Sequence, residues 1–90
     1  MFKIFVNKII PGKTAVEYLW ESDDLNQAAE AMMLFREKIA ELKRDAGIFF
    51  GFGDALEVVL EKGRRGSSND PTLGGFWLVK EVVAKELLQF

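Results

Sequence analysis

The chain contains neither cysteine nor histidine in its 90 residues. The absence of cysteine excludes disulfides, thiolate nucleophiles and sulfur-ligated metals. The absence of histidine removes the commonest metal ligand and the side chain that titrates most readily near neutral pH. The sequence also shows no recognisable nucleophile constellation. We therefore expect no enzyme activity, no metal and no cofactor.

The sequence also has little excess charge and no long apolar stretch. Its 12 basic and 14 acidic residues give a net charge of −2, which is too small to draw the whole molecule onto nucleic acid or an anionic membrane. No segment approaches the ~20 apolar residues of a membrane helix. The first ten residues, MFKIFVNKII, are interrupted by Lys3 and Lys8 and precede no small-residue cleavage site. We expect a cytoplasmic protein with no membrane partner.

Apolar material, in contrast, is abundant. Hydrophobic residues make up 49% of the chain and include eight phenylalanines and two tryptophans. A chain of this length can build only one core, so residues 1–90 are expected to form a single globular domain.

Two strands are predicted before the first helix. In FKIFVNKII the even positions are apolar, and the alternation resumes in TAVEYLWES after a Pro-Gly turn. We expect a hairpin of strands at about 2–10 and 14–21. Val16, Tyr18 and Trp20 are predicted to share one face of the second strand.

The following segment repeats apolar residues every three or four positions, which predicts an amphipathic helix at about 24–45. Asp24 and Gln27 have the spacing of a capping box at its start. Gly47 is placed to end it in a left-handed conformation.

Two further strands are predicted at about 55–62 and 75–82, separated by the Gly-rich loop 63–75. A helix opening at Asp54 is the alternative for the first of them. AKELLQF is expected to close the chain with a short helical turn, and one helix from residue 76 is the alternative. The fold class is therefore α+β: a four-stranded, mainly antiparallel sheet with the long helix on one face.

The triplet GKT in NKIIPGKT does not predict a nucleotide site. A Walker motif needs a glycine where Asn7 stands, and it must open a helix, whereas AVEYLW alternates as a strand does. The paired carboxylates Asp23 with Asp24 and Glu57 with Glu61 can bind a hard cation only if they converge in a cleft. The first pair suits a helix start and the second the polar face of a strand.

The sheet face away from the helix is expected to be half apolar. It would expose Phe5, Ile9, Leu19 and Val59 unless the tail covers it. We therefore expect a small interaction module that binds another protein, most simply a second copy in a homodimer.

The alternative is a nucleic-acid-binding accessory domain. Lys62, Arg64 and Arg65 belong to the Gly-flanked segment 62–66, which is expected to be a loop able to offer guanidinium groups to phosphate. Nearby aromatic side chains, among them Phe50, Phe52 and Trp77, would stack on bases if they were exposed.

Overall fold

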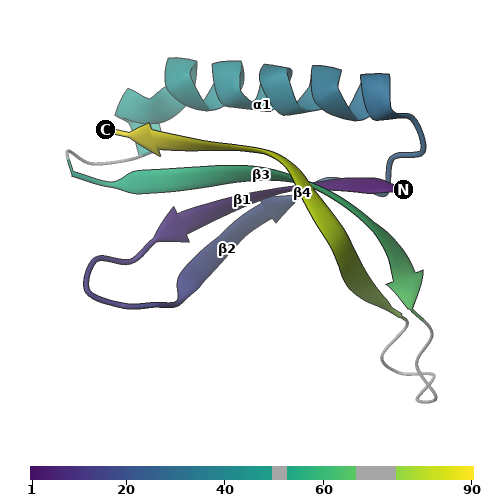
Figure 1. The fold of residues 1–90 in the computed structure, drawn as a ribbon. Helices are drawn as coiled ribbons and strands as arrows, with labels where there is room; N and C mark the ends of the chain where they lie inside the picture. Colours follow the sequence, from purple (N-terminus) through teal and green to yellow (C-terminus); the bar gives the residue numbers. More distant parts are fainter. Residues whose placement is uncertain (50–52, 67–74) are drawn as a thin grey trace.

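The computed structural model describes residues 1–49, 53–66 and 75–90. Four antiparallel strands in the order β2-β1-β3-β4 form one sheet, and one helix packs on one face of it (Figure 1). The elements are β1 (Phe2–Ile9), β2 (Val16–Glu21), α1 (Ala28–Phe49), β3 (Ala55–Gly66) and β4 (Phe76–Gln89). The predicted α+β class, with its antiparallel sheet and single long helix, is confirmed. Within the described ranges no helix is long and apolar enough to cross a membrane.

The helix begins and ends four residues later than its predicted bounds. Its first backbone bond runs from the Ala31 N–H to the Gln27 carbonyl at 3.0 Å. The predicted capping box is wrong, because the segment before the helix pairs with the sheet: Phe2 and Leu25 exchange backbone hydrogen bonds of 2.7 and 2.8 Å. Gly47 lies inside α1 and does not end it.

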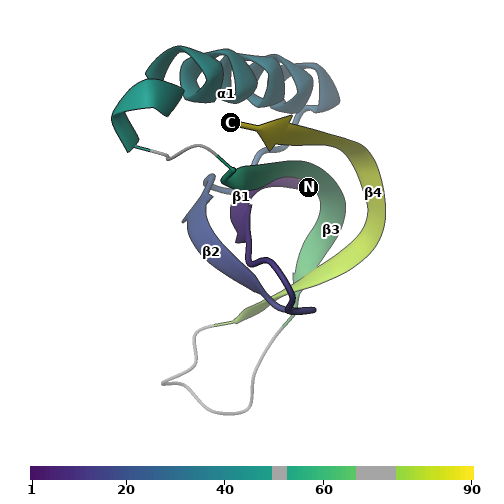
Figure 2. The ribbon, with the colours of Figure 1, turned by 90° about the vertical axis from the view of Figure 1, so that its left-hand side faces the viewer.

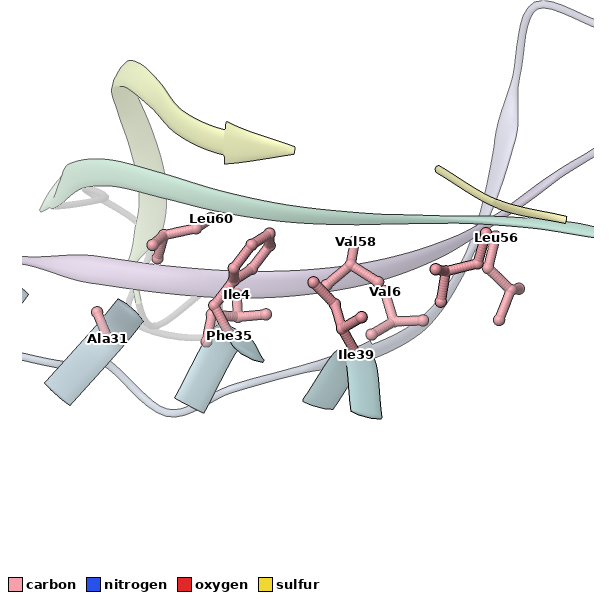
Figure 3. Close-up of a cluster of buried hydrophobic side chains, with 9 residues drawn as sticks. Ile4, Val6, Ala31, Phe35, Ile39, Leu56, Val58 and Leu60 are labelled. Carbon is pink, nitrogen blue, oxygen red and sulfur yellow. The ribbon is translucent and has the colours of Figure 1, made fainter. Parts of the chain in front are cut away.

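The core lies between α1 and the centre of the sheet (Figure 3). Alternate residues of β1 and β3 point to the helix, as their period of two requires. Burying these side chains is the main source of stability, at about 1.5–3 kcal/mol each. The buried cluster consists of Ile4, Val6, Ala31, Phe35, Ile39, Leu56, Val58, Leu60 and Leu88.

The β3–β4 hairpin is longer than the sequence suggested. β3 continues to Gly66, so Gly63, Arg64 and Arg65 are strand residues and the predicted loop loses its first part. The predicted helical turn in AKELLQF is wrong, because β4 runs on to Gln89. The competing readings of a helix at 54 or from 76 are also excluded.

Long-range pairing decides the conformation of this tail. Leu88 lies opposite Leu56 in the ladder and is buried in the core, which stabilises a strand that local helix propensity would not select. The tail consequently adds an edge to the sheet and does not cover its second face.

The sheet curls away from α1 into an open arc, with β2 and β4 at its two sides (Figure 2). Irregular register explains the curvature. β4 has one extra residue opposite the step from Leu60 to Glu61 and another opposite the step from Lys62 to Gly63. β2 has an extra residue, Leu19, opposite the step from Val6 to Asn7. Such bulges bend a strand and increase its twist.

Candidate binding groove

The concave face of the arc forms a groove with a volume of about 740 Å³. That volume lies within the ~300–1,000 Å³ of ordinary ligand sites. The floor comes from the residues of β1 and β3 that point away from the core, and the ladder places Asn7 beside Glu57 and Phe5 beside Val59. The floor residues are Phe5, Asn7, Glu57, Val59 and Glu61.

The two sides of the groove carry exposed apolar side chains. Tyr18 and Leu19 belong to β2, and Val79 and Val82 belong to β4. The exposed fractions of Tyr18 and Val82 are 75% and 54%, so large apolar surfaces face the opening. Isolated exposed apolar residues are common, but a set that flanks one hollow is a candidate contact surface.

Three residues of the predicted partner surface line this groove. Phe5, Leu19 and Val59 are part of it, and Val59 is buried in its floor. Ile9 lies at the end of β1, outside the lining residues. The structure thus brings three of the four residues to one hollow on the face opposite α1, and their role in binding a partner stays a prediction.

The bulge at Leu19 also gives the two aromatic residues of β2 different neighbours, although both belong to the groove lining. Tyr18 lies opposite Asn7 on the groove side, whereas Trp20 lies opposite Val6 on the helix side. Lys38 of α1 stands 4.2 Å from the centroid of the Trp20 ring. The prediction that Tyr18 and Trp20 share one face is thus wrong, because one extra residue shifts the alternation between them.

A tryptophan closes one end of the groove. The Trp77 Nε1–H donates a hydrogen bond of 3.2 Å to Glu61 Oε1, and the Arg65 guanidinium lies 5.8 Å from the Trp77 ring centroid. Among the described residues, Glu61 has no ion pair. Its carboxylate is partly buried and retains accepting capacity beyond the indole bond.

Beyond Trp77 lies a network of four charges. Arg65 holds Asp24 with two hydrogen bonds of 2.9 and 3.0 Å. Lys3 is 4% exposed, and its Nζ lies 3.0 Å from Glu21 and 3.8 Å from Asp24. Hydrogen bonding from Arg65 is the main reason that the pKa of Asp24 falls below 3.8, with the nearby positive charges of Arg65 and Lys3 acting in the same direction. The same bond raises the pKa of Arg65.

Asn7 has an unsatisfied polar atom in the floor. The residue is 6% exposed, and its buried Oδ1 has no hydrogen-bond partner. An unpaired buried acceptor costs about 1–3 kcal/mol, and such groups are rare in folded proteins. Asn7 also lies directly opposite Glu57, whose carboxylate binds Lys85 Nζ at 3.1 Å.

The basic residues of the nucleic-acid alternative do not converge. They lie on strand β3, not on a loop, and adjacent strand residues point to opposite faces. Lys62 and Arg64 therefore share one face, and Arg65 points to the other, where Asp24 binds it. Phe50 and Phe52 lie outside the described residues, and Trp77 binds Glu61.

The paired carboxylates have separate environments. Glu57 and Glu61 share the groove face of β3 but stand about 13 Å apart, given ~3.3 Å per strand residue. Asp23 is exposed, whereas Asp24 binds Arg65. In the ranges that the structure describes, no group of three acidic side chains has the geometry to hold a metal ion.

The predicted partner surface left out most of the groove lining, including Asn7 and Tyr18. Asn7 lies on the same alternating face as Phe5, which was the available signal, whereas the position of Tyr18 depends on register. Glu57 and Glu61 were predicted on the polar face of their strand but were not chosen as binding residues. Comparison with protein-family models, curated proteins and solved structures finds no match.

Proposed function

We propose that this chain is a small non-enzymatic interaction module that holds an extended segment of another protein in the groove. The observation behind the proposal is the groove itself: a hollow with a floor of mixed apolar and polar residues and exposed apolar sides, on the sheet face opposite α1. Protein segments bind such surfaces through apolar anchors and a few polar contacts.

Charge favours a polypeptide over nucleic acid as the occupant. The lining carries three carboxylates, Glu21, Glu57 and Glu61, against the single ammonium of Lys85. A phosphate backbone entering the groove would meet repulsion, since nucleic-acid affinity depends on neutralising phosphates with cations.

The concave shape of the groove argues against the homodimer that the sequence led us to expect through this face. Two concave faces meet only at their rims, so the same face of a second copy would fill the groove poorly. A convex strand or extended segment fits it better. The homodimer stays a prediction, and the long edge strand β4 is the other surface through which it could form.

Panning a display library of random twelve-residue peptides against the immobilised protein tests the proposal. Val79→Lys and Val82→Lys place charge on the exposed groove side, where the fold tolerates it, and Met33→Lys is the matched control on the 61%-exposed outer surface of α1. We expect selected peptides to bind the wild type and Met33→Lys, and to lose at least tenfold in affinity for the two groove variants. Peptides that bind all four proteins equally, or no enrichment, would refute the proposal.

The homodimer is tested by light scattering at micromolar concentration on the wild type, Met33→Lys and one further variant, Leu19→Lys. A dimer that Leu19→Lys dissociates, and that Met33→Lys leaves intact, would identify a second copy as the occupant. A monomer at all concentrations would refute the homodimer prediction. The proposal that the groove binds a protein segment would then depend on the peptide selection alone.

A further inference from the structure

The two polar features of the groove floor lie at opposite ends of it. Asn7 and Glu57 lie at one end, and Glu61 lies beside Trp77 at the other, with Phe5 and Val59 between them. The ~13 Å from Glu57 to Glu61 corresponds to about four residues of extended chain. One extended peptide can therefore contact both ends at once.

The Glu61 end carries one negative charge without an ion pair. Three carboxylates meet two cations there: Lys3 binds Glu21 and Asp24, and Arg65 binds Asp24 with both arms of its guanidinium. Glu61 receives only the neutral Trp77 indole N–H within the described part of the chain. A cation is thus the complementary group at this end.

Arginine suits this end better than lysine does. A planar guanidinium can bond a carboxylate with two parallel N–H groups and stack on an aromatic ring, whereas an ammonium is a compact point charge. Glu61 and the Trp77 ring offer that combination side by side, and Arg65 already lies against the same ring.

The Asn7 end calls for a group that can both donate and accept. The terminal torsion of asparagine is broad and roughly two-fold, so rotation exchanges the carbonyl and amide positions at small energetic cost. A peptide backbone offers an N–H and a carbonyl at every residue, and its N–H can donate to the orphan Oδ1 once rotation of the side chain turns that oxygen toward the groove.

We infer that the groove recognises an extended partner segment carrying an arginine, whose guanidinium binds the Glu61 carboxylate while the segment's backbone bonds Asn7. This inference rests on the proposed function and adds the chemistry that selects the partner.

The test uses the blocked peptide acetyl-Ser-Val-Arg-Val-Ser-amide and the same peptide with citrulline, the uncharged isostere, in place of arginine. Each is titrated into ¹⁵N-labelled full-length protein and followed by NMR. We expect the arginine peptide to shift the Trp77 indole N–H and the Asn7 side-chain amide, and to bind about tenfold tighter than the citrulline peptide, as for one charge-assisted pair.

Glu61→Gln keeps the acceptor for the Trp77 indole but removes the charge, so it should reduce the arginine preference to less than about twofold. Glu37→Gln, on the exposed surface of α1, should leave the preference unchanged.

Equal binding of both peptides, or an arginine preference that survives Glu61→Gln, would overturn the inference. So would the absence of any shift with either peptide. The display selection separates the two levels: groove-dependent peptides without a basic residue would refute the arginine inference alone, and failure to select any groove-dependent peptide would refute the proposed function.

Discussion

Arg65 and Asp24 lie 41 positions apart in the sequence, yet the guanidinium of one holds both carboxylate oxygens of the other, at 2.9 and 3.0 Å. This contact ties the β2–α1 connection to the far half of β3. It also orients Asp24 toward Lys3, whose buried ammonium needs negative neighbours.

Asp24→Asn should therefore destabilise the protein by about 1 kcal/mol at pH 7, the upper range for partly exposed pairs. The folded-state pKa of Asp24 lies below 3.8, so its stabilisation is present above that pH and is lost as the pH falls through the lowered pKa. Urea unfolding between pH 7 and 2 should show the wild type and variant converging in acid.

The exposed neighbour gives a control for this experiment. Asp23→Asn should change the free energy of unfolding by less than about 0.5 kcal/mol across the same range, as typical surface substitutions do. A constant difference between wild type and Asp24→Asn down to pH 2 would contradict the electrostatic explanation.

Gly63 lets β4 cross close to β3. A methyl group there would collide with the backbone oxygen of Leu78 and approach the Trp77 ring at 2.9 Å. We expect Gly63→Ala to destabilise by about 2–3 kcal/mol, since overpacking against a backbone atom cannot be relieved by a rotamer change. Thermal unfolding measures the effect.

Gly66→Ala is the comparison for Gly63→Ala. Its methyl would meet the Phe76 ring at 2.6 Å, but Phe76 is about half exposed and can rotate away. We expect this substitution to cost less than half as much. Equal losses for the two variants would show that the close strand crossing at Gly63 is not the cause.

Trp20 and Lys38 form a contact between the edge strand β2 and the helix, with 4.2 Å from the ammonium to the ring centroid. A double-mutant cycle of Trp20→Leu and Lys38→Met should give a coupling of about 0.5–1 kcal/mol. Lys43→Met, whose ammonium contacts Glu86 instead, should show no coupling to Trp20→Leu. Additive effects of the first pair would argue against the contact.

Two adjacent leucines of β4 are expected to contribute very differently to the stability of the protein. Leu88 is 4% exposed and Leu87 is 52% exposed. Leu88→Ala should destabilise by about 2–4 kcal/mol, as for a buried leucine, and Leu87→Ala by less than about 1 kcal/mol. Chemical denaturation of both variants distinguishes a strand from a frayed tail, for which the two losses would be alike.

Sequence patterns predicted the elements better than their ends and register. The hydrophobic period located α1 and the central strands, because burial on one face dictates it directly. It could not predict the Leu19 bulge, since one extra residue leaves the composition of β2 unchanged while moving Trp20 to the other face. A helical turn was wrongly predicted for the C-terminal tail because AKELLQF favours a helix locally. Its pairing with β3 is a long-range interaction that the local sequence does not reveal.

In the candidate site, too, features set by one strand were predictable, whereas contacts between distant segments were not. The apolar floor residues Phe5 and Val59 follow from alternation along single strands. The pairing of Arg65 with Asp24, and of Glu61 with Trp77, joins segments whose relative placement no local pattern contains. Lys62, Arg64 and Arg65 looked like one basic loop for this reason, although the strand separates them onto two faces.

The bulges of β4 have a consequence for solubility. A 14-residue edge strand with exposed Phe76, Val83 and Leu87 would ordinarily template the addition of further strands and lead to aggregation. The extra residues divide this edge, and its longest regular run, residues 84–89, carries Lys85 and Glu86. The irregularities that hollow the sheet thus also oppose the addition of further strands along its open border.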